Sequence, residues 1–234
     1  MKRSSTLHAL LSAYGVAFVA VLVVVVVLLC LYPKLELHML LNAYHTGVED
    51  TFFKYYSVLA EWPIYLIALL PLFWKRKELT FFFAASEITA GAILQMMKHL
   101  ISMDRPASAF EHSSQFVLPI VNGVELHHSN SFPSGHASTF FVFCTCCALV
   151  VAYHYKQKKN PRKIRVWLVF NLTMLGLFVL AALGGYSRIY LSQHFLSDVI
   201  AGSIIGFVVP CVIFHFFKDK IVKTHPAKEE IAEE

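Results

Sequence analysis

Charged residues are scarce in this chain of 234 residues, and their scarcity is the first guide to its class. Asp, Glu, Lys and Arg make up 15% of the residues, whereas a soluble domain has about 25%. Hydrophobic residues make up 57% and gather in long runs, one of which, 9–32, contains no charge. This composition excludes an ordinary soluble domain and is typical of a membrane protein, so the natural unit is one domain of packed spans, residues 1–234.

Cysteine is also sparse, and its placement excludes a disulfide framework. All five cysteines fall inside apolar runs: Cys30, Cys144, Cys146, Cys147 and Cys211. There they read as small hydrophobic side chains. The cluster "CTCC" at 144–147 would lie at lipid depth with no matching second cluster, so we do not interpret it as a zinc site. The sequence shows no internal repeat.

The apolar runs predict an all-α, polytopic membrane protein with six transmembrane helices. The first run is too long for a signal peptide, and no small-residue cleavage site follows it. Residues 33–54 predict a short interfacial helix. Only 62–74 is uncharged in the second span, so 55–61 must be added to reach about 20 residues. The expected spans are 9–32, 55–74, 79–97, 137–155, 166–187 and 198–217.

The basic residues predict the orientation of these spans. Of the 20 Lys and Arg residues, 15 fall at the chain ends and in the segments 75–77 and 156–165, which share one side of the membrane. The positive-inside rule places that side in the cytoplasm. Both termini, including a tail at 218–234, are therefore expected to be cytoplasmic.

Three polar segments fall on the opposite, non-cytoplasmic side. They are "KHLISMDRP" (98–106), "PSGH" (133–136) and "SRIYLSQHFLSD" (187–198). Each contains His, Lys or Arg next to a span. Ionisable residues at the membrane edge are functional candidates by default, so we expect one site built from all three segments.

The cations of these segments indicate an anion site. Lys98, Arg105 and Arg188 match phosphate oxygens, arginine through its bidentate fork and lysine as a point charge. Ser134 and Gly135 come just before an expected helix, where a hydroxyl and free backbone N–H groups favour an anion.

Two histidines complete the predicted chemistry. Asp198 follows His194 by four residues, so on a helix it would lie on the same face and hold one ring nitrogen, leaving the other free to attack. His136 has no acidic residue near it in sequence and is the better proton donor. The set describes phosphoryl transfer without a metal or other cofactor.

Together, the three segments resemble the signature motifs of the type 2 phosphatidic acid phosphatase (PAP2) superfamily, with the order and spacing of that family. The resemblance implies a six-helix membrane fold and a phosphohistidine intermediate. It implies that His194 is the nucleophile, Asp198 its orienting partner and His136 the general acid. Lys98, Arg105, Ser134, Gly135 and Arg188 resemble the family's phosphate-binding residues.

We therefore expect a lipid-phosphate phosphatase whose partners are its substrate and membrane lipids, with no nucleic acid. The substrate stays open among phosphatidate, phosphatidylglycerol phosphate, undecaprenyl diphosphate and a lipid A phosphate. The short tails suggest a bacterial enzyme of the cytoplasmic (inner) membrane, with its site facing the periplasm. A phosphotransferase and a non-catalytic lipid-phosphate binder are the alternatives, and intact His194, His136 and Asp198 argue against the binder. A vanadate haloperoxidase shares such a pocket, but six spans suit a lipid substrate better.

We expect the remaining polar residues to have structural or surface positions rather than catalytic roles. Glu87 is expected to pair within the bundle rather than react. His127, His128 and Glu125 sit in the polar loop 107–132 and read as surface residues, with contact to a lipid headgroup as the alternative. Four glycines, Gly184, Gly185, Gly202 and Gly206, are expected to ease helix contacts.

Overall fold

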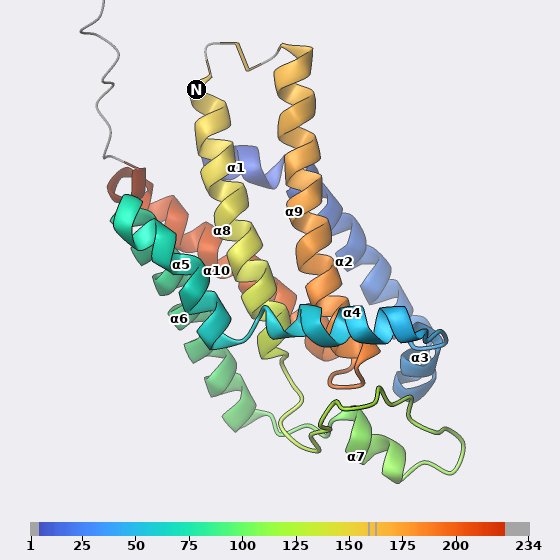
Figure 1. Cartoon of the computed structure of the whole chain (residues 1–234). Helices are drawn as coiled ribbons and strands as arrows, with labels where there is room; N and C mark the ends of the chain where they lie inside the picture. Colours follow the sequence, from blue (N-terminus) through green and yellow to red (C-terminus); the bar gives the residue numbers. More distant parts are fainter. Residues whose placement is uncertain (1–4, 159, 162, 223–234) are drawn as a thin grey trace, which may run out of the picture.

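The computed structural model describes residues 5–158, 160–161 and 163–222. Within these ranges the chain is all-α, which confirms the predicted fold class, and its long helices form a bundle (Figure 1). The helices are α1 (Ser5–Leu10), α2 (Ala13–Leu31), α3 (Lys34–Leu41), α4 (Gly47–Val58), α5 (Trp62–Lys75), α6 (Lys77–Leu100), α7 (Pro106–Glu111), α8 (Gly135–Gln157), α9 (Ile164–Tyr190) and α10 (Leu196–Val222).

Five of these helices are long and apolar enough to cross a membrane: α2, α6, α8, α9 and α10. A sixth span exists only as the pair α4 and α5, which are bent by 63° relative to each other. The expected continuous helix over 55–74 is therefore broken. Glu61 has extended backbone and Pro63 stands at the start of α5, where its ring suits a new helix but cannot continue an old one.

The N-terminal third also differs in detail from the expected 9–32 span and the single interfacial helix over 33–54. Ser12 has extended backbone and separates α1 from α2. The interfacial stretch forms two helices, α3 and α4, and α4 lies across the ends of α8 and α9 (Figure 1). Thr46 begins α4 as a capping residue, because its Oγ1 accepts from the Glu49 backbone N–H at 3.2 Å.

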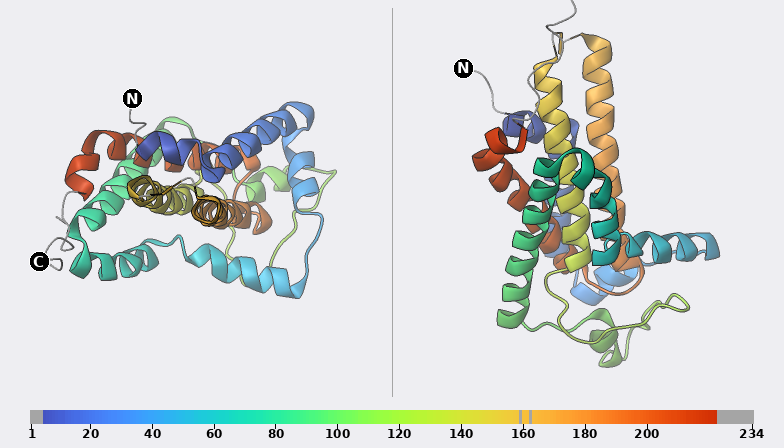
Figure 2. Two further views of the ribbon diagram at one scale, coloured as in Figure 1. Left: turned by 90° about the horizontal axis from the view of Figure 1, so that it is seen from above. Right: turned by 60° about the vertical axis from the view of Figure 1, so that its left-hand side comes forward.

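Helix α8 forms the centre of the bundle and packs against α6, α9 and α10. Seen from above, α8 and α9 lie between α2 on one side and α4 with α5 on the other (Figure 2). The core is aromatic and aliphatic, and Phe82, Val142, Leu149, Met174 and Phe214 are among its fully buried side chains.

Glycines bring α8 close to its neighbours, as expected. A Cβ at Gly202 of α10 would collide with the Ser134 carbonyl oxygen, and one at Gly206 would lie 2.5 Å from the Ser138 carbonyl oxygen. Gly184 of α9 faces the ring of Phe140 in the same way. Only residues without a side chain permit this separation, so the backbone frame of α8 and α10 is set by close contact.

The helix ends divide into two groups. The end of α6, the starts of α8 and α10, and the end of α9 lie together at the lower end of Figure 1 with α3 and α7. The basic connection 75–77 and the described residues of 156–165 lie at the opposite end. From residue 223 on, the expected tail lies outside the described residues, as do Lys2, Arg3, Lys159 and Arg162.

Candidate active site

Four helix ends carry the predicted site residues to one place. Lys98 is in the last turn of α6 and Arg188 in the last turn of α9. Ser134 caps α8, so Gly135 and His136 are that helix's first two residues. Arg105 precedes the short helix α7. His194 differs from the prediction, because it lies in the turn before α10 and not on a helix with Asp198. His194 and Asp198 therefore do not share one helical face.

Burial and side-chain contacts still bring His194 and Asp198 together. Their exposed fractions are 2% and 0%, and His194 Nδ1 lies 3.8 Å from Asp198 Oδ2. That separation is longer than a hydrogen bond. Ser131 Oγ lies beside both groups, donating to Asp198 Oδ2 at 2.5 Å and standing 3.4 Å from His194 Nδ1. The Phe195 backbone N–H donates to the same carboxylate oxygen at 2.9 Å.

Sequence reasoning missed Ser131, and the backbone explains its placement. The Ser131 N–H donates to the Met103 carbonyl at 2.9 Å, and the Arg105 N–H donates to the His128 carbonyl at 3.0 Å. These bonds pair the segment after α6 with the segment before "PSGH". The pairing brings Arg105 and Ser131 to the site together, although 26 positions separate them in the chain.

His194 is uncharged at neutral pH. Burial lowers the pKa of His194 to about 4, and the positive charges of Arg105 and Arg188 act in the same direction, against the opposing effect of Asp198. The ring therefore keeps a free lone pair on one nitrogen, which is the form that a nucleophile needs.

Arg105 and Arg188 act on this ring electrostatically, and Arg188, the more buried of the two, has an unsatisfied donor. Arg188 is 8% exposed, and within the described residues its Nε has no hydrogen-bond partner. This N–H is therefore free to donate to a bound oxyanion. His136 lies within electrostatic range of Arg188, His194, Arg105 and Lys98.

Arg105 is held in place by the neighbouring loops. Its Nε donates to the Ser129 carbonyl at 2.9 Å, and one terminal nitrogen lies 3.3 Å from both the carbonyl and the side-chain oxygen of Gln193. Gln193 in turn donates to the Glu125 carbonyl at 2.9 Å. These contacts use Nε and one terminal nitrogen of the guanidinium, so the other terminal nitrogen, Nη2, can still bind an oxyanion.

The start of α8 offers backbone donors. Ser134 is fully buried, and its Oγ accepts from the Ala137 N–H at 3.4 Å, so the hydroxyl caps the helix. The Ser134 N–H donates to the Asp198 carbonyl at 2.9 Å, which ties the starts of α8 and α10 together. The first-turn N–H groups of α8 have no partner within the helix and can bind an anion.

Comparison with known proteins identifies the family. The model of the PAP2 superfamily matches residues 79–221, more than half of the chain. The chain belongs to the PAP2 superfamily. This PAP2 protein is therefore a multi-pass membrane member of a phosphatase family.

Individual relatives agree with this assignment. Dolichyldiphosphatase 1 of Rhinolophus ferrumequinum is 25% identical over 155 residues, which are 66% of this chain and 60% of that protein. The PAP2 protein thus spans less than two thirds of that relative's length. The crystal structure of LpxE from Aquifex aeolicus has a TM-score of 0.58 at 25% identity, covering 78% of this chain and 94% of the other.

A second crystal structure shares the fold. It is the PAP2-type phosphatidylglycerolphosphate phosphatase of Bacillus subtilis, with a TM-score of 0.54 at 16% identity. The match covers 89% of this chain and 98% of that structure. The fold of the PAP2 protein is therefore that of a transmembrane PAP2 phosphatase.

Other polar groups of the PAP2 protein lie away from the histidines. Thr139 Oγ1 donates to Glu87 Oε1 at 2.5 Å, so Glu87 does pair within the bundle. His128 Nδ1 lies 3.6 Å from Glu111 on the exposed surface, and His127 is also exposed. Within the described residues, no group of three or more His, Cys, Asp or Glu could hold a metal ion, and all five cysteines are free.

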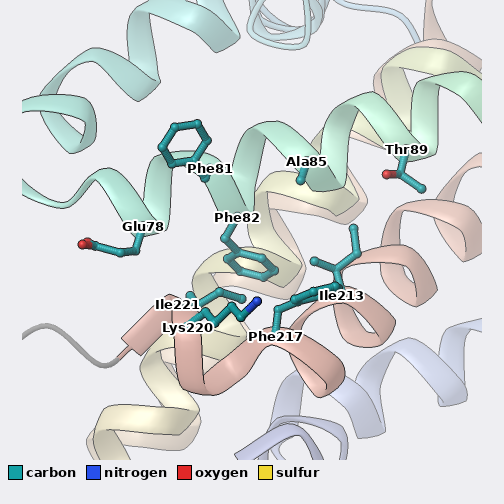
Figure 3. Close-up of a pocket in the computed structure, with 9 residues that line it drawn as sticks. All are labelled: Glu78, Phe81, Phe82, Ala85, Thr89, Ile213, Phe217, Lys220 and Ile221. Atoms are coloured by element: carbon teal, nitrogen blue, oxygen red, sulfur yellow. The ribbon is translucent and has the colours of Figure 1, made fainter.

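The groove in Figure 3 is separate from the site. It has a volume of about 470 Å³ and lies between the first half of α6 and the last turns of α10, with Glu78, Phe82 and Lys220 among its lining residues. Those helix segments are at the opposite end of the bundle from His194, so this groove does not receive the reacting phosphate.

Proposed function

We propose that this PAP2 protein removes phosphate from a lipid through a phosphohistidine intermediate on His194. The observation that carries the proposal is a buried, neutral histidine beside a carboxylate and within electrostatic range of Arg105 and Arg188, at one end of a membrane helix bundle. A neutral imidazole can attack phosphorus, and the cations stabilise the charge that develops on the phosphoryl oxygens.

The first half-reaction follows from the geometry. Lys98, Arg105, Arg188 and the first-turn N–H groups of α8 bind the phosphoryl oxygens. The free ring nitrogen of His194 forms a bond to the terminal phosphorus, while the bond from that phosphorus to the leaving oxygen breaks. The leaving oxygen is the lipid oxygen in a monophosphate and the bridging oxygen in a diphosphate. His136 donates a proton to it, so the leaving group is a lipid alcohol or a lipid monophosphate.

The second half-reaction regenerates the enzyme. His136, now neutral, accepts a proton from water, and the resulting hydroxide attacks phosphorus. The bond from phosphorus to nitrogen breaks, which releases inorganic phosphate and free His194. Asp198 and Ser131 stay on the far side of the ring throughout and hold its orientation.

We propose the non-cytoplasmic face of the inner membrane for the site. The motif ends lie opposite the basic connections of the bundle, and positive segments favour the cytoplasm. In a cysteine-free background, Ser129→Cys should react with an impermeant thiol reagent in intact cells, whereas Gln157→Cys should not. The reverse labelling pattern would overturn this orientation.

The substrate class is a lipid phosphate or diphosphate. One relative is named as a dolichyldiphosphatase and another as a phosphatidylglycerolphosphate phosphatase, and the third is LpxE. The purified protein should release phosphate from at least one of phosphatidate, phosphatidylglycerol phosphate, undecaprenyl diphosphate and a lipid A phosphate. Transfer of labelled phosphate to an added lipid or sugar alcohol, instead of to water, would indicate a phosphotransferase. Binding without turnover of any of the four would indicate a lipid-phosphate binder.

The roles of the two histidines can be separated by the leaving group. A lipid alcohol needs a proton to leave, whereas p-nitrophenolate needs little help. In the formation of the phosphoenzyme, His136→Ala should therefore lose far more rate on a lipid monophosphate than on p-nitrophenyl phosphate. His194→Ala should abolish both reactions. Equal losses for His136→Ala on the two substrates would remove the general-acid role.

A further inference from the structure

The short helix α3 and its C-terminal cap contact the segment 189–195, which carries His194, at three points. Asn42, at the end of α3, donates through Nδ2 to the Ile189 carbonyl at 2.7 Å. His38 Nε2 lies 3.3 Å from Ser192 Oγ, and its ring stands edge-on to Phe195, with the centroids 5.3 Å apart. These contacts lie on both sides of His194 in the chain, and none of the five residues belongs to the phosphate-binding set.

The turn itself needs such support. Ser192 has a φ of +52°, in the left-handed region that residues other than glycine rarely adopt. The Ser192 hydroxyl donates to the Pro119 carbonyl at 2.7 Å, and Asn42 Nδ2 donates to the Ser192 Oγ at 3.4 Å. A residue in this region keeps its conformation only when its surroundings hold it. Here α3 and the loop around Pro119 hold Ser192 from two sides.

His38 is held through one ring nitrogen. Its Nε2 lies 3.1 Å from Asn42 Nδ2 and 3.3 Å from Ser192 Oγ. Burial, the largest cause, lowers the pKa of His38 to about 4, so the ring is neutral at neutral pH. His38 and Asn42 are 2% and 3% exposed, so neither meets bulk water.

We propose that His38 and Asn42 are positioning residues for the nucleophile. They hold the turn 191–195 so that the ring of His194 stays aimed at the bound phosphoryl group. The inference rests on the proposed function, in which His194 attacks phosphorus. Attack requires the reacting atoms to be about 3–3.5 Å apart and aligned, and a misplacement of about 1 Å can cost about 10²-fold in rate.

The test uses the full-length protein in detergent with p-nitrophenyl phosphate, in single turnovers with the enzyme in excess. At saturating enzyme, the observed rate constant reports the attack step and does not depend on what fraction of the enzyme is folded. Asn42→Ala and His38→Leu should lower this constant by about 10- to 100-fold, with little change in the enzyme concentration that gives half-saturation. Asn122→Ala and His127→Ala change the same residue types on the exposed loop and should leave it unchanged.

A conservative variant sharpens the test. His38→Gln offers a side-chain oxygen that can accept the Asn42 N–H, so it should retain more of the attack rate than His38→Leu. Unchanged rate constants for Asn42→Ala and His38→Leu beside an active wild type would overturn the positioning role alone, even if both variants melt at lower temperature. Absence of turnover by the wild type on this substrate and on the four lipid phosphates would overturn the proposed function, and the positioning role with it.

Discussion

The contact between α8 and α10 allows a sharp test of how the active site is held. Gly202 is one turn after Asp198 on α10, and a Cβ at this position would collide with the Ser134 carbonyl oxygen on α8. Ser134 and Asp198 are joined by their backbones at 2.9 Å. Gly202→Ala should therefore separate the starts of the two helices that carry His136 and Asp198.

The magnitude can be worked from the second glycine of the same contact. A Cβ at Gly206 would lie 2.5 Å from the Ser138 carbonyl oxygen, and real Cβ atoms essentially never come closer than 3.0 Å to such atoms. At least about 0.5 Å must be accommodated there, and more at Gly202. Overpacking of this kind costs about 1–3 kcal/mol of stability. Since a shift of about 1 Å at reacting groups costs about 10²-fold, phosphoenzyme formation in Gly202→Ala should fall by about 10- to 100-fold.

Two other glycines supply matched controls. A Cβ at Gly91 of α6 or Gly176 of α9 would meet nothing within 4 Å. Alanine there should leave activity unchanged and favour the helix by about 0.5–1 kcal/mol. The assay measures the melting temperature in detergent and the rate of phosphoenzyme formation for Gly202→Ala, Gly206→Ala, Gly91→Ala and Gly176→Ala. If Gly202→Ala behaved like Gly91→Ala, the close contact would not be what positions the site.

Three further predictions follow from the site. Ser131→Ala removes the hydroxyl between Asp198 and His194, so phosphoenzyme formation should slow by about 10-fold while substrate affinity changes little, and an unchanged rate would exclude a role for Ser131. The pKa values of His38 and His194 are lower in the folded state, so below about pH 6.5 the unfolded chain binds more protons than the folded chain. The free energy of unfolding should therefore decrease as the pH is lowered from about 6.5 to about 4. His38→Gln should make this decrease smaller, as measured by the melting temperature at each pH. Activity should survive EDTA and be inhibited by vanadate, whereas loss in EDTA with recovery on adding Mg²⁺ would contradict the proposed chemistry.

The hydrophobic runs predict most of the fold because a segment that crosses the lipid bilayer has to be helical. In hydrocarbon, backbone groups must be satisfied within the segment, so a long uncharged run becomes a helix, as in α8 and α9. The same signal could not predict the break between α4 and α5. There the helix is interrupted by the backbone geometry of Glu61 and Pro63, which depends on two residues rather than on the average of twenty.

The three motifs predicted which residues gather at the site, but not all of the groups that hold them. Ser131, His38 and Asn42 are buried polar residues whose side-chain hydrogen-bond partners lie at least 63 positions away, apart from the contact between His38 and Asn42 themselves. Nothing in their local sequence distinguishes them from polar loop or interfacial residues. Their roles arise from tertiary contact alone, so only a structure reveals them.

The spacing inside the third motif has a backbone explanation. The Arg188 carbonyl accepts from the N–H groups of both Gln193 and His194, at 2.9 and 3.1 Å. These bonds close a turn at the end of α9, and that turn returns His194 toward the arginine six residues before it. An inserted or deleted residue would break both bonds and move the ring relative to the cation. The interval from Arg188 to His194 is therefore a geometric requirement of placing His194, the proposed nucleophile, beside Arg188, the proposed phosphate-binding arginine, at a helix end.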